Sequence, residues 1–104
     1  MYFYSLNGKS PSVSFRDALI NGIAPDKGLY FPEKINKLPD NFISNLENYS
    51  NEEIAYECII QYVGQDIPEL DLRKIIHDVL SFYFPIEKIN NQISFLELFH
   101  GPTM

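Results

Sequence analysis

The sequence predicts an α+β fold with three to four helices, a short N-terminal strand and a C-terminal β-hairpin or strand. Three observations support this fold class: an aromatic-rich, weakly alternating start, helix-capping sequences followed by apolar residues at helical spacing, and two extended segments that flank an Asn-Asn pair. With 104 residues, the chain has the length of one domain, and we expect residues 1–104 to form a single unit.

The first third of the chain predicts a strand, a helix and a second short extended piece. Residues 2–6 alternate and favour a strand. Ser14-Phe15-Arg16-Asp17 resembles a capping box, with aspartate in place of the usual Glu or Gln, and Gly22 is suited to end that helix. The turn at residues 24–28 is expected to place Gly28 at positive φ, and residues 29–31 should then be extended.

The middle of the chain predicts three further helices. The first opens at Pro39-Asp40 and continues to Tyr49, and the second starts at the full capping box Ser50–Glu53 and ends at Gly64. Pro68 suits the first position of the third helix, which must stop before Pro85. Helical spacing predicts that the last two helices pack around a core that also takes a residue from the first helix: Ile54, Ile59, Leu72, Ile76, Val79 and Leu19.

The end of the chain predicts a hairpin. Residues 86–89 and 92–99 flank Asn90-Asn91, a pair that tolerates positive φ. Its second strand carries apolar side chains on both faces, which is typical of a strand inside a larger sheet. We therefore expect the chain to be the opening piece of a larger protein. In isolation, residues 93–99 should pair or pack with another copy or fold back over their own domain, with fraying as the alternative.

Composition narrows the classes of partner. Eight Lys+Arg against 14 Asp+Glu give a net charge of −6, which argues against nucleic acid or an anionic membrane surface as a partner. Cys58 is the single cysteine, so an internal disulfide or a multi-cysteine zinc site is excluded, and we expect no metal. The chain start lacks the pattern of a signal peptide and the apolar runs are too short to span a bilayer, so a cytoplasmic domain is expected.

A family resemblance lies at the C-terminus. Residues 96–103, Leu-Glu-Leu-Phe-His-Gly-Pro-Thr, resemble the LELFHGPT segment of threonine synthase. In that family the segment runs into x-A-F-K-D, whose lysine forms the Schiff base with pyridoxal phosphate. Further similarities occur in the same order along the chain: residues 14–18 with Gly22, residues 28–32, residues 64–68 and residues 82–85.

The resemblance implies the N-terminal domain of a lyase that converts O-phospho-L-homoserine and water to L-threonine and phosphate. It implies pyridoxal phosphate as the cofactor of the full-length enzyme and the remainder of that enzyme as the partner. Residues 93–104 would begin the cofactor-binding region. The catalytic lysine would lie three residues beyond Met104, and none of the six lysines in the chain matches its motif position. This piece alone should therefore be inactive and bind no cofactor.

Four residues are candidates for a place near the substrate or cofactor: His100, Gly101, Pro102 and Thr103. Gly101 would let the backbone approach a ligand, Pro102 would stiffen the loop, and Thr103 would either donate to a phosphate oxygen or cap a following helix. His100 would either meet the substrate or order the loop. The competing function is a free-standing binding or regulatory module whose residues 95–99 add to a partner's sheet.

Overall fold

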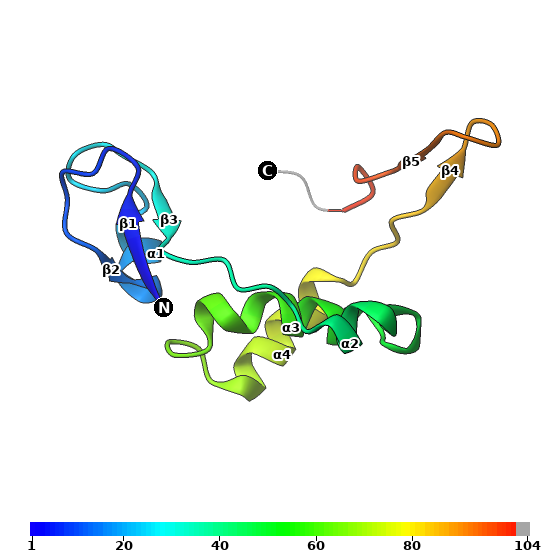
Figure 1. Ribbon diagram of the computed structural model, residues 1–104, viewed down its shortest axis with the longest axis horizontal. Helices are drawn as coiled ribbons and strands as arrows, with labels where there is room; N and C mark the ends of the chain where they lie inside the picture. Colours follow the sequence, from blue (N-terminus) through cyan, green and yellow to red (C-terminus); the bar gives the residue numbers. More distant parts are fainter. Residues whose placement is uncertain (102–104) are drawn as a thin grey trace.

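The structure, a computed structural model that describes residues 1–101, confirms the α+β fold class. Figure 1 shows a sheet with one helix at one end of the molecule, a β-hairpin at the other end, and the remaining helices between them. The radius of gyration is 16.9 Å, compared with about 13 Å for a compact chain of this length. In chain order the elements are β1 (Tyr2–Ser5), β2 (Val13–Ser14), α1 (Phe15–Asn21), β3 (Tyr30–Pro32), α2 (Asp40–Ser44), the 3-10 helix η1 (Leu46–Asn48), α3 (Asn51–Val63), α4 (Glu69–Val79), β4 (Ile86–Lys88) and β5 (Ser94–Leu96).

The N-terminal strand is the centre of a three-stranded antiparallel sheet with the order β2-β1-β3. Phe3 and Ser5 point inward and are buried, whereas Tyr2 and Tyr4 are exposed. The weak alternation read from the sequence is therefore real, although one of its inward positions is polar. Strand β2 was not predicted, because two residues are too few to show a period.

Asp26 holds the turn between α1 and β3 to the sheet. Its carboxylate accepts hydrogen bonds from the Ser5 hydroxyl at 2.6 Å, the Lys9 amide at 2.8 Å and the Gly28 amide at 3.0 Å. The amide of Asp26 in turn donates to the Ser10 hydroxyl at 3.1 Å. Hydrogen bonding, from Ser5 above all, lowers the pKa of Asp26 from its ordinary 3.8 to about 2.

The expected positive φ at Gly28 is wrong, because Lys27 takes that conformation instead, with φ 65°. Gly28 is required for a different reason, since a Cβ atom there would lie 2.0 Å from Ser5 Oγ and 2.9 Å from the Asn7 amide nitrogen. The turn therefore packs so closely onto β1 that only a residue without a side chain fits behind Asp26.

The expected ends of α1 are confirmed. The Ser14 hydroxyl accepts from the Asp17 amide at 3.0 Å, and Gly22 follows the helix with φ 69°. Ala18 is buried and the Phe15 ring lies 5.8 Å from that of Phe3, which fixes the helix against β1.

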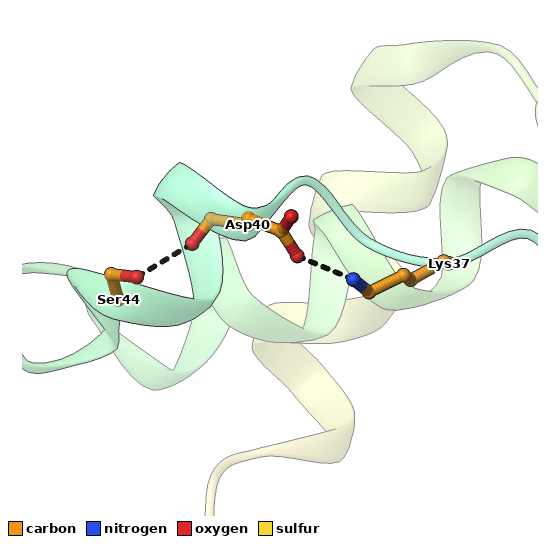
Figure 2. A network of polar contacts seen from close by, with 3 residues as sticks. All are labelled: Lys37, Asp40 and Ser44. Carbon is orange, nitrogen blue, oxygen red and sulfur yellow. Dashed lines mark hydrogen bonds and ion pairs between the residues drawn. The ribbon is translucent and has the colours of Figure 1, made fainter.

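The helix expected from Pro39 to Tyr49 is interrupted at Asn45. The Ser44 hydroxyl donates to the Asp40 carbonyl at 2.8 Å, and Asn45 Nδ2 donates to the Asn41 carbonyl at 2.7 Å. Side chains that bond to carbonyls four residues earlier weaken a helix, so α2 gives way to η1. Figure 2 shows the Ser44 contact and the ion pair at the start of α2, where Lys37 Nζ lies 2.5 Å from Asp40 Oδ1. Both of these charged side chains are exposed, so the pair adds little stability.

Helices α3 and α4 form an antiparallel pair that carries the main apolar cluster. Ser50 and Glu53 form the expected capping box at the start of α3, with bonds of 3.2 and 2.7 Å. Gly64 follows α3, and α4 begins after Pro68 and ends at Val79, before Pro85, as predicted. The buried cluster consists of Val63, Leu72 and Ile76.

The expected core is only partly correct. Leu72 and Ile76 are buried and Ile54 is half-buried, but Leu19 is 66% exposed, Ile59 42% and Val79 58%. Helical spacing identified the apolar face of each helix correctly, yet within residues 1–101 only part of that face has a neighbouring element. Cys58 is half-buried.

We predict that Ile76→Ala lowers the free energy of unfolding by about 2–5 kcal/mol, because Ile76 is 7% exposed and packs against Leu72 and Val63. Val79→Ala on the same helix is the control, and its cost should stay within about 0.5 kcal/mol because Val79 is largely exposed. Urea titration of the three proteins measures both values. Equal losses in the two variants would contradict the observed helix packing.

We also predict that acid weakens the turn through Asp26. Since the pKa of Asp26 is lower in the folded chain than its ordinary 3.8, its contribution is fully present above about pH 4 and is lost as the pH falls towards about 2. Asp26→Asn should therefore flatten the fall in unfolding free energy over this range, while Asp66→Asn, in the exposed loop after α3, should leave it unchanged. Urea titrations at several pH values measure the slopes, and identical slopes in all three proteins would exclude this role.

Candidate functional site

The β4–β5 hairpin positions the predicted site at the C-terminal end of the described chain. The strands are antiparallel, with Ile86 opposite Leu96 and Lys88 opposite Ser94. One residue past β5, the Glu97 amide donates to the Pro85 carbonyl at 3.0 Å, which extends the pairing. The expected hairpin is therefore confirmed, and it holds the residues before His100 in a defined register.

Asn90 and Asn91 do not adopt the positive φ that this pair tolerates, because among residues 1–101 Lys27 is the only non-glycine residue with positive φ. The loop is instead wider, and Asn90 closes it with its side chain. Asn90 Oδ1 accepts from the amides of Gln92 at 2.8 Å and Ile93 at 3.0 Å. Asparagine thus forms the turn through an Asx-type hydrogen bond rather than through its tolerance of left-handed backbone.

His100 is paired with Glu97. His100 Nε2 lies 2.6 Å from Glu97 Oε2, and the His100 ring centroid is 4.5 Å from that of Phe99. The Glu97 side chain is 18% exposed and that of His100 39%. Glu97 is not among the predicted site residues, because a contact between residues three apart outside a helix has no periodic signal in the sequence.

Gly101 lies against the ring of Phe82. A Cβ atom on Gly101 would be 2.6 Å from Phe82 Cζ and 2.8 Å from Cε1. Among the described residues, the close neighbour of Gly101 is therefore an aromatic ring of the segment after α4. The approach to a ligand expected at this glycine stays a prediction. That ring is half-buried and meets Phe84 edge-on at 5.9 Å. Of the four predicted site residues, Pro102 and Thr103 lie outside the described residues.

The described residues do not form a cradle for pyridoxal phosphate. All six lysines are exposed, whereas a Schiff-base lysine is normally activated by desolvation or by a neighbouring charge. Every buried side-chain nitrogen or oxygen in residues 1–101 has a hydrogen-bond partner within the chain. None of these buried groups therefore needs a ligand to satisfy its hydrogen bonds. No group of three or more potential metal ligands gathers in this part of the chain. No step on the cofactor is therefore assigned to residues 1–101.

Two further surface features lie on the helices. An apolar groove of about 300 Å³ runs along α3 and α4 and is lined by Ala55, Ile59, Leu72, Ile75, Ile76, Val79 and Leu80. A charged hollow nearby contains Tyr56, with the Arg73 guanidinium 4.0 Å from its ring centre. His77 of α4 pairs with Glu52 of α3 at 2.9 Å, and that carboxylate raises the pKa of His77. None of the helices in residues 1–101 is both long and apolar enough to cross a membrane.

Comparison with known proteins decides the family. The family described as "Threonine synthase N terminus" matches residues 2–80. The chain belongs to this family. Among curated threonine synthases, the protein of Schizosaccharomyces pombe is 34% identical over 97% of this chain, and that of Pseudomonas aeruginosa is 30% identical over all of it. The resemblance read from LELFHGPT is thereby confirmed.

Solved threonine synthase structures match the arrangement of the whole chain. A PLP-bound threonine synthase from Brucella melitensis superposes with a TM-score of 0.90 over 98% of this chain at 31% identity. The Escherichia coli threonine synthase gives a TM-score of 0.88 over 99% at 26% identity. The chain spans only 21–24% of the length of these four threonine synthases. The extended shape, with the hairpin apart from the sheet, is thus shared with much longer proteins.

Proposed function

We propose that this chain is the N-terminal domain of a pyridoxal-phosphate-dependent threonine synthase, a cytoplasmic enzyme that converts O-phospho-L-homoserine and water to L-threonine and phosphate. The observation that carries the proposal is the superposition of nearly the whole chain on a PLP-bound threonine synthase. The family match over residues 2–80 supports it independently of the C-terminal motif.

In this proposal residues 1–104 form one domain, and residues 93–104 lead into the cofactor-binding region. Pyridoxal phosphate supplies the chemistry by storing carbanion electrons while protons and phosphate leave the substrate. His100, Gly101, Pro102 and Thr103 lie at the edge of that region, and the remainder of the enzyme is the partner of this domain. The lysine that holds the cofactor lies outside residues 1–104, so these residues alone have no activity and bind no cofactor.

We predict that residues 1–104 release no phosphate from O-phospho-L-homoserine in the presence of pyridoxal phosphate, whereas the product of the complete reading frame does. The reason is that the chain offers no lysine suited to a Schiff base. Heat-treated protein is the control for both samples. Phosphate release by residues 1–104 above that control would refute their inactivity.

The codons that follow Met104 separate this proposal from a free-standing module. Codons for Ala-Phe-Lys-Asp directly after Met104 support the enzyme, and a stop codon at that position supports the module. A complete product that carries the lysine but releases no phosphate would contradict the proposed reaction.

The same proposal implies that the hairpin of the isolated chain binds another protein surface through its exposed apolar side chains. Phe95 is 46% exposed, Leu98 66% and Phe99 66%, and no side chain of β4 or β5 is buried. A two-stranded hairpin is marginally stable by itself and leaves one edge of each strand unpaired. Full burial of each such apolar side chain is worth roughly 1.5–3 kcal/mol. In isolation, residues 93–99 therefore pair with a second copy.

We predict that residues 1–104 associate with increasing concentration in analytical ultracentrifugation and that Phe95→Lys with Leu98→Lys abolishes the association. The control replaces two apolar residues away from the hairpin strands, Leu70 and Tyr83, by lysine; both are more exposed than Phe95 and Leu98, and this variant should associate like the wild type. A monomeric wild type at every concentration would show that the hairpin remains unpaired.

A further inference from the structure

We propose that Glu97 is a positioning residue of this enzyme: it fixes the imidazole of His100 in one orientation and one tautomer, and so presents Nδ1 to the substrate or to its attacking water. This inference rests on the proposed function, because it assigns a role to His100 in the proposed reaction.

The contact between Glu97 and His100 defines the tautomer. The two atoms, Glu97 Oε2 and His100 Nε2, are 2.6 Å apart, which is within hydrogen-bond distance, and a bond to an ionised carboxylate is stronger than one between neutral groups. An ionised carboxylate can only accept, so Nε2 carries the proton and donates it. In the neutral ring Nδ1 is then the acceptor. Within residues 1–101, Glu97 is the only hydrogen-bond partner of the His100 ring.

Glu97 is itself held in place. Its amide donates to the Pro85 carbonyl at 3.0 Å, directly after the last register pair of the hairpin. Its side chain is 18% exposed, whereas Glu87 on the opposite strand belongs to a strand whose residues are all exposed. The carboxylate therefore starts from a fixed backbone position and is shielded from water, which strengthens its bond to the imidazole.

A second contact fixes the backbone on the other side of His100. Gly101 lies against the Phe82 ring so closely that a Cβ atom would come within 2.6 Å of it. His100 thus stands between a paired strand end at Glu97 and a packed glycine. This arrangement leaves the ring little freedom to turn, and a preorganised ring of this kind contributes to catalysis without being reordered at each turnover.

The test uses the enzyme encoded by the complete reading frame. Glu97→Ala should lower kcat/KM by about 10–100-fold, as is usual when the residue that orients a functional histidine is removed. Glu97→Gln, which keeps an acceptor oxygen, should retain most of the activity. The matched control is Glu87→Ala on the opposite strand, and it should leave kcat/KM within about twofold of the wild type.

A double-mutant cycle distinguishes positioning from stability. If Glu97 acts through His100, then Glu97→Ala should cost less than about twofold in kcat/KM once His100→Ala is present. An unchanged cost in that background would overturn the inference, because a purely structural loss does not depend on the imidazole.

Nuclear magnetic resonance provides a readout that does not depend on turnover. In enzyme with ring-¹⁵N-labelled histidine, the His100 signals are assigned by their loss in His100→Gln and should show Nε2 protonated and Nδ1 not. Glu97→Ala should remove that preference. If the wild type releases no phosphate, the proposed reaction fails while these spectra still decide the pairing. A protonated Nδ1 with a bare Nε2 in the wild type would overturn the inference.

Discussion

The small amount of buried apolar surface limits the stability that hydrophobic packing gives to the whole structure. The chain is 45% hydrophobic, yet within residues 1–101 only seven hydrophobic side chains are buried: Phe3, Ala18, Ala24, Phe42, Val63, Leu72 and Ile76. They are divided between the sheet and the helices, and the hairpin has none. Since hydrophobic burial is the main favourable term in folding, neither group can form a large core by itself, and each part depends on local polar contacts for its shape.

Three such contacts have comparable roles in different parts of the chain. Asp26 ties the turn to β1 through hydrogen bonds from Ser5, Lys9 and Gly28. The Ser50–Glu53 capping box starts α3, and Glu97 joins the end of the hairpin to His100. Each satisfies backbone or ring groups that the small cores cannot cover, which is why acidic side chains are found at the turning points of the chain.

Sequence reasoning succeeded where the signal is local. Capping residues marked the starts of α1 and α3, and proline marked the limits of α4. It failed where the burial of a side chain or the conformation of the backbone depends on another part of the chain that packs against it. The period of α4 identified Val79 as apolar, but the period cannot say whether anything lies against that face, and Val79 is exposed. The positive φ of the first turn fell on Lys27 because Gly28 was needed for its lack of a side chain.

The candidate site followed the same pattern. The motif singled out His100 and Gly101 as candidates, since these residue types are specific in that order. The partners that hold them, Glu97 and Phe82, emerge only from the path of the chain. In the sequence Glu97 is a single charge on an apolar strand, and its contact with the imidazole is visible only in the structure.

The local character of these contacts also has a consequence for synthesis on the ribosome. Ser5 and Asp26 are 21 residues apart, α3 and α4 are consecutive helices, and the hairpin closes on its own loop. Contacts between residues close in sequence form quickly and need no later part of the chain. The sheet and the helix pair can therefore assemble as the chain emerges. The apolar groove along α3 and α4 can then form without contacts from later parts of the chain.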